Sequence, residues 1–105
     1  MATVPMDQRE GWIWYNGEMV PWKDAKLHVL THGLHYASSV FEGQRAYGGE
    51  VFKLREHTER LIGSGKILDF TIPYSADEID EACRQVLAKN DLTARLIDLV
   101  SRIRN

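Results

Sequence analysis

The sequence has few cysteines, little net charge and no long hydrophobic run. Its single cysteine, Cys83, cannot form an intrachain disulfide, and its apolar neighbours predict a packing role, as expected in a reducing cytoplasm. The 13 basic and 15 acidic residues give a formal net charge of −2, so a nucleic acid would meet no broad cationic surface. No segment is apolar over enough residues for a signal peptide or a membrane span, so we expect neither.

The composition is that of one folded domain. A chain of 105 residues suits a single domain better than two, and 44% hydrophobic with 27% charged residues indicates a real core. We expect a flexible N-terminus over residues 1–11, a folded domain over 12–91 and a distinct segment over 92–105.

Two hairpins are predicted in the first half of the chain. Aromatic and β-branched residues at 12–15 precede Asn16-Gly17, a pair that tolerates the positive φ angles of a type I′ turn, and a second strand follows at 18–20. Pro21 limits that strand because it has no N–H to donate. A second hairpin is predicted with strands at 44–47 and 50–54 around Gly48-Gly49.

Helical spacing replaces the strand pattern in the second half. A helix is predicted over 55–68, where Glu56 and Arg60 are spaced for an i,i+4 ion pair. The capping-box residues Ser75 and Glu78 start another helix. Its expected apolar face is Ile79, Ala82, Cys83, Val86 and Leu87, and the residues expected to face water are Asp80, Glu81, Arg84 and Lys89. Strands followed by helices predict an α+β domain with helices on one face of an antiparallel sheet.

Three histidines, His28, His32 and His35, lie within eight residues and raise the possibility of a metal site. No carboxylate or thiolate stands at ligand spacing beside them. Histidine clusters are often satisfied structurally, so we expect no metal.

Several longer motifs, in uninterrupted order over roughly residues 12 to 93, make the chain resemble the branched-chain amino acid aminotransferases, which are pyridoxal-phosphate enzymes of fold type IV. The more specific of them are Ser-Val-Phe-Glu-Gly at 39–43 and His-x-x-Arg-Leu at 57–61. The others are Trp-Tyr-Asn-Gly-Glu-Met-Val at 14–20, Thr-His-Gly-Leu-His-Tyr at 31–36 and Val-Phe-Lys-Leu at 51–54.

The resemblance implies roles for four residues. Arg60 would bind the cofactor phosphate, for which a guanidinium fork is suited in shape and charge. Phe41 would line the apolar pocket for the substrate side chain, and Tyr36 would reach the active site of the neighbouring subunit in a homodimer. Arg45 is a candidate for contacting substrate carboxylates, although an exposed strand arginine is an equally good interpretation.

The resemblance also implies features that this sequence does not contain. The family has a Tyr-x-Arg pair where Leu96 and Asp98 stand here, and a larger domain that carries the lysine bound covalently to the cofactor. No lysine of this chain falls in that catalytic motif. We therefore expect no catalytic residue and no bound cofactor in these 105 residues alone.

The final segment has a helical period in place of the family's strand. An apolar stripe is formed by Leu92, Leu96, Leu99, Val100 and Ile103. Such a helix could cover the domain's own sheet or bind a second chain, which leaves two classes of function open. The chain is either an aminotransferase segment that is inactive alone or a non-catalytic module that forms a homo-oligomer.

Overall fold

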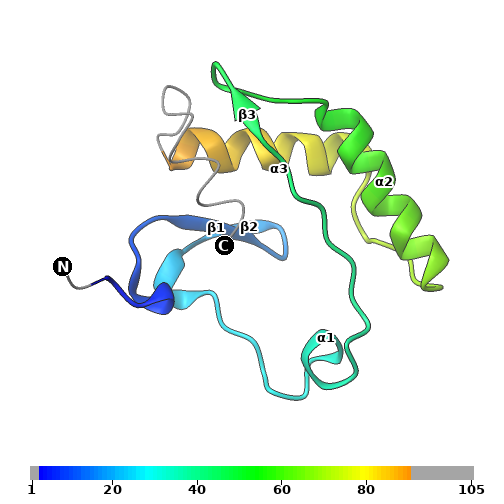
Figure 1. The fold of residues 1–105 in the computed structure, drawn as a ribbon, viewed down its shortest axis with the longest axis horizontal. Coiled ribbons are helices and arrows are strands. Elements are labelled where there is room, and N and C mark those ends of the chain that lie inside the picture. The colour runs from blue at the N-terminus through cyan, green and yellow to red at the C-terminus, as the bar shows by residue number, and fades with distance from the viewer. Residues whose placement is uncertain (1–2, 91–105) are drawn as a thin grey trace.

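The computed structural model describes residues 3–90, and its two long helices follow all of its strands along the chain (Figure 1). The α+β class expected from the sequence is confirmed. The short 3-10 turns are η1 (Met6–Gln8) and η2 (Trp22–Asp24). The strands and helices are β1 (Trp12–Tyr15), β2 (Glu18–Pro21), α1 (His32–His35), β3 (Ala46–Tyr47), β4 (Glu50–Val51), α2 (Leu54–Ile67) and α3 (Ala76–Lys89).

The first hairpin has the predicted turn. Strands β1 and β2 pair antiparallel with Tyr15 opposite Glu18 and Trp12 opposite Pro21. Asn16 and Gly17 both have positive φ, 50° and 91°, as a type I′ turn requires. Strand β2 ends at Pro21, where the missing N–H was expected to limit it.

The second hairpin is shorter than predicted. Strand β4 stops at Val51, and Lys53 takes a left-handed conformation with φ of 53° directly before α2 begins. The prediction of a strand through Leu54 was therefore wrong, because this reversal turns the chain into the helix. The described strands also form two separate two-stranded sheets, so the helices do not cover one continuous sheet.

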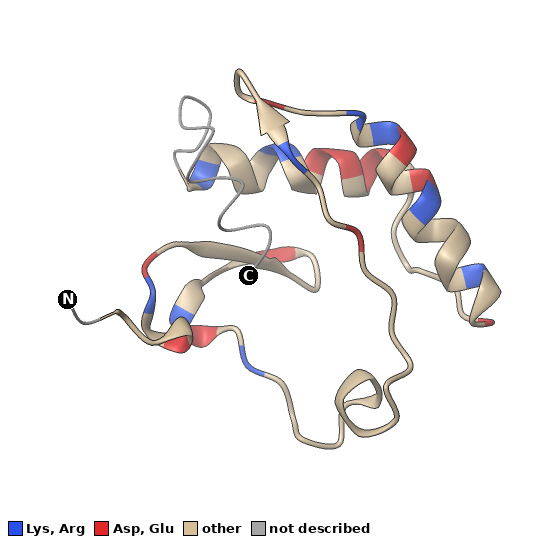
Figure 2. Cartoon of the chain, viewed as in Figure 1, with Lys and Arg blue, Asp and Glu red and all other residues tan. Residues whose placement is uncertain are grey.

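Helix α3 is the element that contacts β1, β4 and α2. The predicted capping box begins it: the Glu78 N–H donates to Ser75 Oγ at 3.1 Å, and the Ser75 N–H donates to Glu78 Oε1 at 3.0 Å. At its other end the Asn90 side chain accepts from the Trp12 N–H at 2.8 Å and donates to the Trp12 carbonyl at 3.0 Å. Asp and Glu gather in the N-terminal part of α3 and Lys89 lies in its last turn (Figure 2), which complements the helix dipole.

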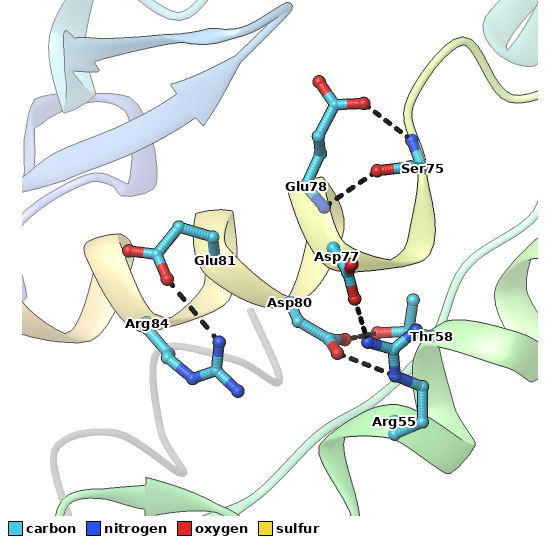
Figure 3. A network of polar contacts seen from close by, with 8 residues as sticks. All are labelled: Arg55, Thr58, Ser75, Asp77, Glu78, Asp80, Glu81 and Arg84. Atoms are coloured by element: carbon cyan, nitrogen blue, oxygen red, sulfur yellow. Dashed lines mark hydrogen bonds and ion pairs between the residues drawn. The ribbon is translucent and has the colours of Figure 1, made fainter.

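Asp80 corrects the sequence interpretation of α3. It was expected to face water, yet only 3% of its surface is exposed. Its carboxylate accepts from the Thr58 hydroxyl at 2.6 Å and pairs with Arg55 Nε at 3.0 Å, and Arg55 also contacts Asp77 (Figure 3). The prediction that Asp80 faces water was wrong because helical periodicity shows which residues share a helix face, but not which polar side chains of another element contact that face. These contacts join α2 to α3.

The apolar core of the described residues is small. Ala46 and Leu87 are buried together, with Val51 packed against them. Cys83 is partly buried, and burial raises the pKa of its thiol, which agrees with a packing role. Many large apolar side chains are instead exposed, and those between β2 and β3 are Leu27, Val29, Leu30, Leu34, Tyr36 and Phe41. No helix in residues 3–90 is long and apolar enough to cross a membrane.

Candidate functional site

The two most specific sequence motifs meet at one ion pair. Glu42, in the irregular segment before β3, accepts from Arg60 on α2 through both of its carboxylate oxygens. The Arg60 Nε lies 3.0 Å from Oε1 and 2.8 Å from Oε2, and Nη2 lies 2.7 Å from Oε1. A bidentate pair of this kind fixes the orientation of the guanidinium as well as its distance from the carboxylate.

His57 completes the cluster. Its Nδ1 lies 2.7 Å from Glu42 Oε1, and it stands one helical turn before Arg60, so both side chains reach the same carboxylate from α2. The Glu42 side chain is only 9% exposed, whereas that of Arg60 is 67% exposed. The cluster therefore consists of a covered carboxylate beneath an outward-facing guanidinium.

The cluster keeps Glu42 ionised. The hydrogen bonds from Arg60 are the largest cause that lowers the pKa of Glu42, and with the His57 contact they bring it from 4.5 to about 2 although burial opposes the shift. The same contacts raise the pKa of Arg60. Both groups are thus charged near neutral pH.

This geometry corrects the partner expected for Arg60. The sequence predicted an i,i+4 pair with Glu56, but Arg60 instead pairs with Glu42, 18 residues away. Sequence reasoning gave no role to Glu42 or to His57. Their place in the sequence could have indicated a role, because Glu42 lies in the same motif as Phe41 and His57 lies in the same motif as Arg60.

The arrangement is suited to anion binding. Glu42 occupies the guanidinium edge made by Nε and Nη2, and within residues 3–90 no side chain accepts from Nη1, so the other edge can donate to a phosphate or carboxylate. Within residues 3–90 no group of three His, Cys, Asp or Glu side chains is placed to hold a metal ion.

The other predicted site residues lie in the same connection between β2 and β3 as Glu42. Tyr36 directly follows α1 and is exposed, and Phe41 stands beside Glu42 with 86% of its surface exposed. Arg45 is also exposed, and its carbonyl accepts from the Phe52 N–H at 2.7 Å. Their substrate roles remain predictions.

A family model described as amino-transferase class IV matches residues 39–104, which include both motifs and most of the final segment. The chain belongs to this family. Its sequence and fold are also homologous to those of branched-chain amino acid aminotransferases, as individual relatives show.

Three relatives illustrate the similarity. A probable branched-chain-amino-acid aminotransferase of Rickettsia felis is 51% identical over 92 residues, which are 88% of this chain and 32% of that protein. The branched-chain amino acid aminotransferase from Escherichia coli is 53% identical, with a TM-score of 0.77 over 81% of this chain and 30% of that one. The branched-chain aminotransferase from the archaeon Thermoproteus uzoniensis, solved with norvaline, is 39% identical with a TM-score of 0.76, over 82% and 30% of the two chains. This chain thus spans about a third of the length of its relatives.

The lowered pKa of Glu42 predicts a pH-dependent stability difference. Because its pKa is about 2 in the folded protein against 4.5 normally, ionised Glu42 stabilises the fold above pH 4.5, and this contribution is lost as pH falls towards 2. Glu42→Gln should therefore cost on the order of 1 to 2 kcal/mol near pH 7, after allowing for screening of the exposed Arg60, and less with increasing acidity. Urea unfolding of both proteins from pH 7 to pH 2.5 measures this, and a pH-independent difference would contradict it.

Proposed function

We propose that this chain is the N-terminal part of an enzyme that transfers amino groups between branched-chain amino acids and 2-oxoglutarate with pyridoxal phosphate. In this proposal Arg60 contacts the cofactor phosphate. The main support for this function is the Glu42–Arg60 ion pair, which joins the two family motifs and leaves one edge of the Arg60 guanidinium facing outward.

The residues present fit one part of the cofactor. A largely exposed guanidinium whose outer N–H donors have no acceptor among residues 3–90 matches a phosphate dianion in charge and geometry, and it is held by Glu42, which His57 contacts in turn. Pyridoxal phosphate, when bound, supplies an electron sink for negative charge on the substrate. We expect the lysine that holds the cofactor to come from outside this segment, so the 105 residues alone should be inactive.

The substrate-side roles belong to the same proposal. Phe41 would line the pocket for the branched apolar side chain, Tyr36 would reach a neighbouring subunit's site, and Arg45 would contact substrate carboxylates. The exposure of Phe41, directly before Glu42 in the sequence, and of Tyr36 supports this assignment, because large apolar side chains of this kind are commonly covered by a partner surface.

Phosphate binding by Arg60 can be measured directly. Because one arginine in water is an incomplete anion site, we expect pyridoxine 5′-phosphate to bind with a Kd on the order of millimolar. This probe lacks the aldehyde and so does not react with lysines, and pyridoxine without phosphate serves as the ligand control. Side-chain NMR should show the Arg60 Nε–H signal shifting with the phosphate ester only, and the binding should be lost in Arg60→Ala. No response at Arg60, or a micromolar Kd, would count against this prediction.

The alternative is a non-catalytic module that self-associates. The exposed large apolar side chains between β2 and β3, among them Leu30, Leu34 and Phe41, favour it because a partner surface could cover them. The stripe expected at 92–103 lies outside the described residues. Light scattering should report a homo-oligomer for the intact chain and a smaller species for Phe41→Asp, with Glu56→Asp as control. A monodisperse monomer for the intact chain would refute the association.

A further inference from the structure

Glu42 covers one edge of the Arg60 guanidinium and leaves the other edge exposed. We propose that Glu42 is a positioning residue that aims the free edge of Arg60 at the phosphate of the bound ligand, with His57 fixing the carboxylate. This inference rests on the proposed function, because it takes phosphate as the ligand of Arg60.

The contacts define which donors are used. Both Glu42 oxygens lie within 3.0 Å of Arg60 Nε, and Oε1 lies 2.7 Å from Nη2, so the carboxylate faces the side edge of the guanidinium. The end edge, formed by Nη1 and the second N–H of Nη2, then presents two nearly parallel donors. That is the arrangement in which arginine binds a phosphate through two oxygens at once.

Glu42 can set this direction because it is itself held. Its side chain is 9% exposed, and His57 Nδ1 lies 2.7 Å from Oε1. His57 and Arg60 both come from α2, so the carboxylate connects the segment before β3 to a rigid helix. A side chain as long and exposed as Arg60 would otherwise sample many rotamers, and restricting it beforehand lowers the entropic cost of binding.

The negative charge of Glu42 and its positioning of Arg60 have opposite effects on phosphate affinity. Removing the Glu42 charge raises the positive potential at Arg60, so a purely electrostatic role predicts tighter phosphate binding by Glu42→Gln. A positioning role predicts weaker binding. Glu42→Asp distinguishes the electrostatic role from the positioning role more sharply, because it keeps the negative charge but shortens the side chain by one methylene.

The experiment uses the 105-residue chain with Glu42→Asp and Glu42→Gln, and with Glu56→Asp and Glu56→Gln as matched controls. Glu56 is an exposed carboxylate on the same helix, one turn before Arg60. Backbone amide spectra establish that each variant is folded. The readouts are the rotational order of the Arg60 side chain by NMR without ligand, and the Kd for pyridoxine 5′-phosphate.

We expect restricted Arg60 rotation in the parent and in the Glu56 variants, and free rotation when Glu42 is changed. The Kd should rise roughly threefold to tenfold for Glu42→Asp, and the Glu56 variants should bind as the parent does. Equal Arg60 mobility in the parent and in Glu42→Gln would overturn the inference whatever the ligand does. Phosphate binding at Arg60 that is unchanged or tighter in Glu42→Asp would overturn it and leave the proposed function standing. An ordered Arg60 that does not respond to phosphate would overturn both.

Discussion

Asp80→Ala is expected to lower the free energy of unfolding by about 3 kcal/mol. The substitution leaves the fully buried Thr58 hydroxyl without its acceptor at 2.6 Å and removes the Arg55 contact at 3.0 Å. These contacts link α2 to α3, and the apolar core available to compensate is small. Urea unfolding followed by circular dichroism measures the loss.

Asp77→Ala is the matched control for this prediction. Asp77 contacts the same arginine from the same helix, but its side chain is 89% exposed. Exposed ion pairs contribute little, and its position in the first turn adds only a modest dipole effect, so the cost should be below about 1 kcal/mol. Equal losses for Asp77→Ala and Asp80→Ala would show that burial of the network is not what stabilises the helix pair.

The 105-residue chain is expected to show no transfer of amino groups from leucine, isoleucine or valine to 2-oxoglutarate. Under the proposed function this chain supplies one phosphate contact and part of a pocket wall, while the covalent lysine comes from elsewhere. Loss of a covalent catalytic group removes most of an enzyme's rate enhancement, so the deficit should be many orders of magnitude. Glutamate formation is measured against a control with pyridoxal phosphate alone. Turnover above that control would refute the prediction.

The features that could be predicted from the sequence are local ones. The Asn16-Gly17 turn depends on φ angles that those two residues tolerate, and the start of α3 depends on a hydrogen-bond exchange between Ser75 and Glu78. Each is determined within four residues. The end of the second hairpin was missed because Val51 to Leu54 suit a strand, and only the left-handed backbone at Lys53 shows the turn.

The polar partners could not be predicted because they join distant parts of the chain. Thr58 and Asp80 are 22 residues apart, and Glu42 and Arg60 are 18 apart. Periodicity placed Asp80 on a helix face, but it could not show that a hydroxyl and a guanidinium from α2 meet that face. For Arg60, the local Glu56 was the only partner that spacing could suggest, so the partner from outside the helix was missed.

Under the proposed function, this segment should be able to replace the corresponding part of a branched-chain aminotransferase in a chimera. Residues 12–90 would replace the aligned segment of the Escherichia coli enzyme, to which the chain is 53% identical. The chimera should keep leucine-dependent amino transfer within about tenfold of the parent, because the two segments are 53% identical and share a fold with a TM-score of 0.77. Arg60→Ala in the chimera should lower activity on the order of a hundredfold at limiting pyridoxal phosphate, with partial recovery in excess cofactor. A folded chimera without activity, or one in which Arg60→Ala changes nothing, would contradict the account.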